Sequence, residues 1–245
     1  MNDDEKVFQR VEKKYLITAE QMNAIIEASK KKLKPDKYFK SEIFNIYFDT
    51  RNFDLIIKSI ENPDFKEKLR ARSYGGYNKV FMEIKTKLKE KGGVRIGHKR
   101  RFLITHKEYK KLINKEKTAV ELAGDDIETG NDLQIAKEVD YLINYFNLKP
   151  QILVYYDRKS YRGKNDFRVT FDENLGFRQT DLNFHRKVHD KHYFKDKKNI
   201  IMEVKARGAM PLWFAHLLSE NKVFPVRFSK IGKIYELIKK EAINV

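Results

Sequence analysis

Strict alternation of charged and apolar residues is the dominant pattern along the chain. In the segment 80–87, Glu83 and Lys85 share one parity, whereas Met82 and Ile84 share the other. Because successive side chains of a strand point to opposite faces, this pattern predicts a strand with one charged and one apolar face. The same alternation recurs in further segments, namely 10–14, 68–72, 95–101, 156–158, 167–172 and 200–207.

Helical spacing of apolar residues separates these predicted strands. Thr18 and Gln21 form a capping box at the start of a helix that runs to Leu33, and Thr105 and Glu108 form a second one. Three more helices are predicted, namely 132–146, 211–221 with Pro211 at its first helical position, and a C-terminal helix capped by Ser229. We interpret their apolar stripes as packing faces.

The connecting segments carry weaker signals. His185, His189 and His192 could bind zinc by their spacing, but with no Cys in the chain we expect them to be solvated or bound to polar partners. Turns or irregular structure are expected in four segments, namely 62–67, 89–93, 124–132 and 178–198. No repeat or flexible linker divides the chain, so the sequence predicts a single domain over 1–245.

The overall charge points to an anionic partner. Lys and Arg number 52 against 35 Asp and Glu, which gives a formal net charge of +17. Genome composition alone can enrich lysine, so the position of the charges matters more than their number. The charged N-terminus lacks a secretory signal, and no apolar stretch approaches the roughly 20 residues that cross a bilayer. We therefore expect a cytoplasmic protein without a transmembrane segment.

A sheet with so many cations on one face requires an explanation. Any single strand could turn its charged face to water without a function, but like charges side by side across a sheet repel. Closing about eight such strands into an antiparallel barrel, with the apolar parity outward under the helices, would give a cationic lumen that phosphate oxygens neutralise. The predicted fold is therefore α+β, a closed eight-stranded barrel or tunnel covered by helices. An isolated Glu in that lumen would be an oxygen ligand for Mg²⁺ or Mn²⁺.

Nine ordered motifs follow one another over nearly the whole chain, namely Arg10-x-Glu12-x-Lys14-Tyr15, Tyr47-Phe48-Asp49-Thr50, Leu69-Arg70-x-Arg72-x-Tyr74, Phe81-Met82-Glu83-Ile84-Lys85-x-Lys87, Lys99-x-Arg101-Phe102, Tyr156-x-Arg158, Arg168-Val169-Thr170-Phe171-Asp172, Met202-Glu203-Val204-Lys205 and Phe228-Ser229-Lys230. In this order they resemble the vacuolar transporter chaperone (VTC) domain, a branch of the triphosphate tunnel metalloenzymes.

The resemblance implies a divalent-metal-dependent polyphosphate polymerase, which transfers the γ-phosphate of ATP onto orthophosphate or a growing polyphosphate chain. It implies that Glu203 binds the metal, with Glu83 and Glu12 as further candidate ligands or as salt-bridge partners of the cations. The catalytic cations would be Lys14, Arg70, Arg72, Lys85, Lys99, Arg158, Arg168, Lys205, Arg227 and Lys230. Among them, the triphosphate would be held mainly by Arg70, Arg72, Lys85, Arg158 and Arg168.

The chain departs from the family pattern in two motifs. Arg227 stands where the family usually has Lys, so a bidentate fork replaces a point charge. The motif Arg10-x-Glu12-x-Lys14 lacks the first Glu of the Glu-x-Glu-x-Lys motif typical of CYTH-type hydrolases, which favours the VTC-like branch. Eukaryotic members also carry a phosphate-sensing domain and membrane helices that we do not see here, so coupling synthesis to translocation would need a separate membrane partner.

Two alternatives to the polymerase remain open at this point. The first is a metal-dependent tripolyphosphatase or nucleoside triphosphatase on the same scaffold, with water as the acceptor. The second is a non-catalytic module that binds polyphosphate without turnover. We do not expect a nucleic-acid partner, because the aromatic residues mostly share the apolar parity instead of lining the basic face.

Overall fold

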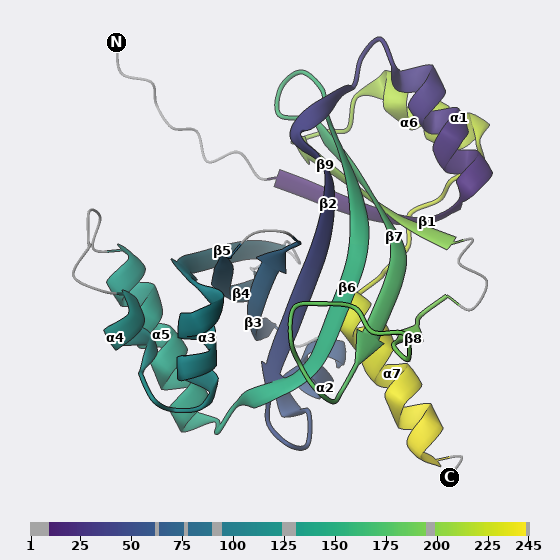
Figure 1. Ribbon diagram of the computed structural model, residues 1–245. Coiled ribbons are helices and arrows are strands. Elements are labelled where there is room, and N and C mark those ends of the chain that lie inside the picture. Colours follow the sequence, from purple (N-terminus) through teal and green to yellow (C-terminus); the bar gives the residue numbers. More distant parts are fainter. Residues whose placement is uncertain are drawn as a thin grey trace, which may run out of the picture. The chain divides into compact units, whose positions relative to one another are not determined.

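The computed structural model describes residues 10–61, 64–75, 78–89, 95–123, 131–194 and 199–243 (Figure 1). The strands are β1 (Arg10–Thr18), β2 (Lys34–Asp49), β3 (Phe65–Tyr74), β4 (Val80–Lys89), β5 (Arg95–Ile104), β6 (Lys149–Arg162), β7 (Arg168–Arg178), β8 (Lys191–His192) and β9 (Asn199–Arg207). The helices are α1 (Ala19–Ser29), α2 (Asp54–Ile60), α3 (His106–Ile113), α4 (Ala119–Ala123), α5 (Asn131–Tyr145), α6 (Leu212–Glu220) and α7 (Lys230–Ile243).

Hydrogen bonds join the strands in the order β1-β9-β7-β6-β2-β3-β4-β5, with β8 paired to β7, which confirms the α+β class. The described ladders are antiparallel, as predicted. Within the described residues, however, no ladder joins β1 to β5, so the predicted barrel is not closed by hydrogen bonds. The free edge of β1 is occupied instead: Tyr15 bridges Pro225, and the backbone N–H of Val226 donates to the carbonyl of Lys14 at 2.7 Å.

The chain divides into two compact units. Unit 1 comprises Met1–Ser41, Tyr156–Leu175 and Phe194–Phe228. Unit 2 comprises Glu42–Tyr155, Gly176–Tyr193 and Ser229–Val245. Each unit has a hydrophobic core of its own, and the strands β2, β6 and β7 are each divided between the two units.

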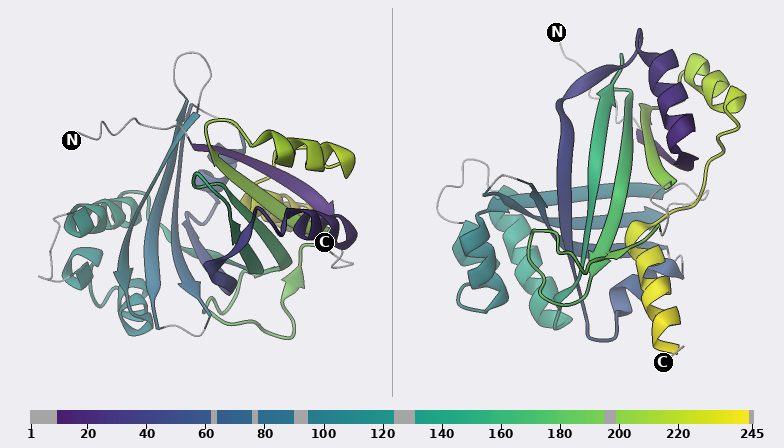
Figure 2. Two further views of the ribbon diagram at one scale, coloured as in Figure 1. Left: turned by 90° about the horizontal axis from the view of Figure 1, so that it is seen from above. Right: turned by 45° about the vertical axis from the view of Figure 1, so that its right-hand side comes forward.

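In unit 2, helices α3, α4 and α5 lie against one face of β3, β4 and β5 (Figure 2, left). The apolar parity of these strands faces the helices: Leu69, Met82 and Phe102 are buried in one core with Tyr109 of α3 and Val139 of α5. Since neighbouring side chains of a strand point to opposite faces, the charged parity is left on the other face of the sheet. This distribution is the one that the alternation predicts for these strands.

Unit 1 repeats the arrangement with different helices. Helices α1 and α6 lie side by side in Figures 1 and 2 and cover the apolar parity of β1, β7 and β9. Met22 and Ile25 of α1 share a core with Phe171 and Met202, and Phe214 of α6 is fully buried there. The charged parity of the same strands again lies on the opposite face.

Local signals placed the helix starts well. Both predicted capping boxes form, at Thr18 and at Thr105. The hydroxyl of Ser229 accepts from the backbone N–H of Gly232 at 3.4 Å, at the start of α7 as predicted. The prediction for Pro211 was off by one position, because Pro211 is the N-cap and its ψ of 131° is extended, so the helix begins at Leu212.

The four segments expected to be irregular differ in outcome. Most of 89–93 and of 124–132 lies outside the described residues, and β3 starts at Phe65, so the predicted turn at 62–67 is shorter than expected. The described part of 178–198 holds only the short strand β8 and is organised by the buried Arg178. Its guanidinium donates to the carbonyls of Asp181, Asn183 and His185 and pairs with the Asp190 carboxylate at 2.9 Å.

Gly176 gives a stability prediction, because its missing side chain leaves room for the Tyr155 ring. A Cβ at Gly176 would lie 2.2 Å from Cζ of Tyr155, whose side chain is 1% exposed and cannot move into solvent. We expect Gly176→Ala to lower the free energy of unfolding by about 1–3 kcal/mol through overpacking, measured by urea denaturation. Gly97→Ala is the matched control, because there the nearest atom lies at 3.6 Å. Equal effects of the two substitutions would contradict this explanation.

Candidate functional site

The charged face of β3, β4 and β5 carries the first group of predicted site residues. The register places Arg70 opposite Glu83, and two residues further along it places Lys85 between Lys68 and Lys99. Three adjacent strands of unit 2 therefore present their long charged side chains in neighbouring rows. The structure brings Arg70, Glu83, Lys85 and Lys99 together, although they are up to 29 positions apart in the chain.

Glu83 lies at the centre of a group of cations that we call the Glu83 cluster. Its carboxylate is fully buried, and its Oε2 accepts from Nε and NH2 of Arg70 at 2.9 and 2.6 Å. Nε of Arg72 lies 3.9 Å from the same oxygen. The second oxygen, Oε1, lies 3.6 Å from Nζ of Lys99 and 3.9 Å from NH1 of Arg101. One carboxylate thus faces four cations.

The electrostatics of the Glu83 cluster show an excess of positive charge. Burial raises the pKa of Glu83, but the charges of Arg70, Arg72 and Lys99 outweigh it and lower the pKa to about 2. Burial lowers the pKa of Lys99, and Glu83 opposes that effect. Oε1 of Glu83 is buried without a hydrogen-bond partner among the described residues. The cluster therefore has the charge to attract an anion.

Two neutral side chains hold the arginines of this cluster in place. The hydroxyl of Tyr47 accepts from NH1 of Arg70 at 3.3 Å. The amide oxygen of Asn45 accepts from Nε of Arg72 at 2.8 Å, and the Asn45 amide nitrogen donates to the carbonyl of Val154 at 3.2 Å. A guanidinium that is fixed in advance loses less entropy when it binds an anion.

The second group of predicted site residues lies in unit 1, on the charged faces of β1, β7 and β9. The register pairs Lys14 with Glu203, and Glu203 in turn with Thr170. One position further along this face, Glu12 pairs with Lys205. Adjacent antiparallel strands therefore place acids and bases alternately, in contrast to the cation-rich rows of unit 2.

Ion pairs of 3.6–3.9 Å connect these residues. Nζ of Lys14 lies 3.6 Å from Glu12 and 3.9 Å from Glu203, and it donates to the carbonyl of Phe228 at 3.0 Å. Nζ of Lys205 lies 3.7 Å from the other carboxylate oxygen of Glu12. Lys14 thus links the two carboxylates that the sequence proposes as metal ligands in this unit.

Arg158 completes what we call the Glu203 cluster. Its guanidinium donates to both carboxylate oxygens of the buried Asp172, at 2.6 and 2.7 Å, and its NH2 donates to Glu203 at 3.4 Å. Burial lowers the pKa of Arg158, but the charges of Asp172 and Glu203 outweigh it and raise that pKa. The cluster consists of three cations and three carboxylates, namely Lys14, Arg158, Lys205, Glu12, Asp172 and Glu203.

Four predicted cations lie outside the two clusters. Lys85 lies two residues along β4 from Glu83, between Lys68 and Lys99. Arg168 is in register with Lys205 but pairs with Asp36 at 3.1 Å, and its Nε is buried without a hydrogen-bond partner among the described residues. Arg227 is exposed, in the segment that follows the bridge to β1. Lys230 is the first residue of α7.

The Glu203 cluster fits a divalent metal better than the Glu83 cluster does. In the described part of the chain, no three acidic or histidine side chains are grouped closely enough to hold a metal alone. Mg²⁺ and Mn²⁺ are often bound by one or two carboxylates together with substrate phosphates. Glu203 and Glu12 supply such carboxylates, and the hydroxyl of Thr170, opposite Glu203, is buried without a partner among the described residues. Glu83 instead has its carboxylate surrounded by cations.

The sequence comparisons assign the family. The model of the VTC domain matches residues 9–238. The chain belongs to the VTC domain family. One curated relative is vacuolar transporter chaperone complex subunit 4 of Schizosaccharomyces pombe, which is 27% identical over 162 residues. The match covers 60% of this chain and 22% of that subunit, so the chain spans about a fifth of its relative's length.

One solved structure shows the same fold. The putative adenylyl cyclase HpAC1 from Hippeastrum, described as having a dominant triphosphatase activity, superposes on this VTC-domain chain with a TM-score of 0.54 at 15% identity. The superposition covers 91% of this chain and 93% of HpAC1. PH1819 of Pyrococcus horikoshii, at a TM-score of 0.48 and 15% identity, is a weaker match. The likeness at this identity concerns the fold alone.

Proposed function

We propose that this VTC-domain chain is a metal-dependent polyphosphate polymerase that transfers the γ-phosphate of ATP onto a phosphate chain. The observation that carries the proposal is the Glu83 cluster, where four cations face one buried carboxylate. Family membership supports the same reaction class. A neutral substrate would leave this charge uncompensated, whereas phosphate oxygens would neutralise it.

The two clusters have different charge balances, and we propose different roles for them. The Glu83 cluster has an excess of cations, so it binds phosphate oxygens, with Arg70 and Arg72 as forked donors. Glu83 then serves as the counter-charge that keeps the cations in place without a substrate. In the Glu203 cluster, cations and carboxylates are equal in number and pair with each other. A divalent cation could therefore take the place of the side-chain cations beside the carboxylates, and phosphate oxygens could take the place of the carboxylates beside the cations.

In this proposal Glu203 and Glu12 would hold the divalent ion. The same ion would be the partner that the buried hydroxyl of Thr170 lacks among the described residues. The bound ion would supply charge neutralisation to the phosphates undergoing transfer. Lys14 and Arg158 keep Glu203 oriented through their contacts at 3.9 and 3.4 Å.

The chemistry requires positioning more than proton transfer. The terminal phosphate of a polyphosphate chain is already an oxyanion, so it can attack the γ-phosphorus without a general base. The residues that make up the two clusters accordingly include cations and carboxylates but no histidine. Stabilisation of transferred negative charge by fixed Arg and Lys side chains is then the main catalytic contribution.

An assay of the purified chain with ATP and Mn²⁺ tests the proposal. We expect ADP and polyphosphate chains that lengthen with time, resolved by gel electrophoresis, and no product when the metal is chelated. Orthophosphate without longer chains would instead identify a triphosphatase, the activity named for HpAC1. Metal-independent binding of polyphosphate without any turnover would contradict the enzymatic proposal as a whole.

A further inference from the structure

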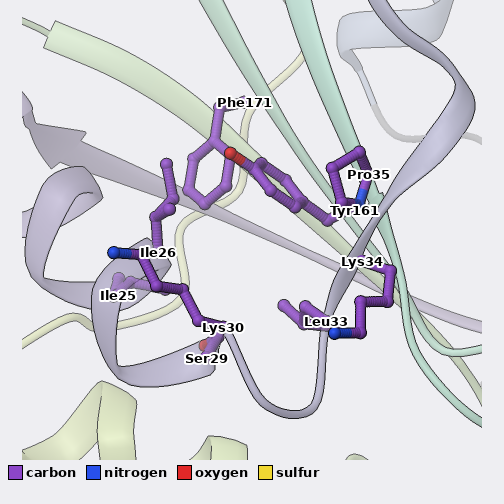
Figure 3. A pocket seen from close by; sticks show the side chains of 9 residues that line it. All are labelled: Ile25, Ile26, Ser29, Lys30, Leu33, Lys34, Pro35, Tyr161 and Phe171. Carbon is purple, nitrogen blue, oxygen red and sulfur yellow. The ribbon is translucent and has the colours of Figure 1, made fainter.

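An apolar pocket lies in unit 1 on the side of the sheet covered by α1. Its volume is about 280 Å³, and its apolar lining comes from α1, from the start of β2, and from β6 and β7 (Figure 3). The apolar lining residues are Ile25, Ile26, Leu33, Pro35, Tyr161 and Phe171. Such a volume is close to that of the smaller ligand-binding pockets of proteins.

Two polar groups make this pocket more than a packing defect. Ser29 lines it and is 1% exposed, and its hydroxyl is buried without a hydrogen-bond partner among the described residues. Leaving such a group unsatisfied is unfavourable, so it indicates a missing partner. Lys34 also lines the pocket, and in Figure 3 its side-chain nitrogen ends beside Leu33.

The surrounding turn is strongly basic. Six lysines occur between positions 30 and 40, and the single acid there, Asp36, pairs with Arg168 at 3.1 Å. Lys30 lines the pocket as well and pairs with Glu27 on its own helix. An apolar cavity with a cationic rim and a buried hydroxyl matches a molecule with an apolar body and an anionic group.

We propose that this pocket binds a small amphiphilic carboxylate, such as a medium-chain fatty acid, and that Lys34 pairs with its carboxylate. The apolar body would occupy the space between α1 and Tyr161 and Phe171. The Ser29 hydroxyl would donate to an oxygen of the ligand. The proposal does not depend on the polymerase activity, because none of the pocket residues belongs to the Glu83 or Glu203 cluster.

Two segments connect the pocket with residues of the charged face: β7 leads to Asp172 of the Glu203 cluster, and the start of β2 leads to Arg168. Phe171 lines the pocket, and its neighbours Thr170 and Asp172 point to the opposite face of β7, where Asp172 pairs with Arg158. Pro35 lines the pocket, and the next residue, Asp36, pairs with Arg168. An occupant therefore contacts two segments that position predicted phosphate-binding cations.

Isothermal titration of the full chain with octanoate tests the proposal. We expect one site with a dissociation constant of about 0.1–1 mM, a range typical of ligands of this size. Acetate, which has the charge without the body, and 1-octanol, which has the body without the charge, should each bind at least about fivefold more weakly. Saturating tripolyphosphate should leave octanoate binding unchanged, because it competes only for the charged clusters.

Variants locate the site. Lys34→Gln should weaken octanoate at least about fivefold and leave 1-octanol unaffected, whereas Lys31→Gln, on the same turn but outside the pocket lining, should change neither. Ile26→Trp should fill the cavity and abolish binding of both. Absence of saturable octanoate binding would overturn the proposal. Binding that tripolyphosphate displaces, or that Lys34→Gln and Ile26→Trp leave intact, would overturn it equally.

Discussion

Replacing Glu203 by glutamine should lower the rate of phosphoryl transfer by at least about 10²-fold, the loss usually seen when one charge-stabilising group is removed. The substitution keeps the shape of the side chain but removes the charge that would bind the metal. It also leaves Lys14 and Arg158 without one of their carboxylate partners. The rate is measured as ADP formation from ATP at saturating Mn²⁺.

Separate binding measurements distinguish a lost metal site from a lost phosphate site. We expect Glu203→Gln to weaken Mn²⁺ binding, followed by electron paramagnetic resonance, while affinity for tripolyphosphate in the absence of metal changes little. Glu173→Gln is the matched control, because Glu173 lies on the same sheet and pairs with Lys159 at 2.7 Å outside both clusters. Full turnover by the Glu203 variant would exclude this residue from the reaction.

The sequence predicted much of the fold because alternation is a local signal with a physical cause. A period of two determines which face of β4 is apolar, and Val80, Met82 and Ile84 are all buried as this requires. Closure of the sheet is different, since it depends on which strand edges pair across long separations. Here residues 225–226 pair with β1, and no periodicity within β1 itself indicates this partner.

For the candidate site, too, the local pattern was predictable, whereas the long-range contacts were not. Parity alone assigned Arg70 and Glu83 to charged faces, and the register then brought them into contact. The contacts of Asp172 with Arg158 and of Arg101 with Glu83 were not predicted, although these residues belong to the alternating pattern. The reason is that the sequence does not state which strands are neighbours. Asn45 was missed for another reason: it is a neutral residue in a buried strand, with no charge signal to identify it.

Removing the charge of Glu83 should have the largest effect on stability. The carboxylate is fully buried against Arg70, and its loss leaves four cations facing each other without a counter-charge. Breaking a buried ion pair on one side costs about 3–5 kcal/mol, so we expect Glu83→Gln to lower the free energy of unfolding by that amount in urea denaturation at pH 7. Glu138→Gln, which removes the charge of a carboxylate that pairs with Arg100 and is 25% exposed, should cost about 0–1 kcal/mol.

The pH dependence separates this electrostatic effect from a packing effect. The pKa of Glu83 is lowered to about 2 in the folded chain from an ordinary value of 4.5, so its contribution is complete above pH 4.5 and is lost as the pH falls toward 2. A shift of that size corresponds to about 3 kcal/mol. The stability difference between the native chain and Glu83→Gln should therefore shrink progressively below pH 4.5. Tripolyphosphate should also stabilise the variant at pH 7, because its oxygens replace the missing counter-charge. A difference that stays constant from pH 7 to pH 3 would show that packing, and not the buried charge, makes Glu83 necessary.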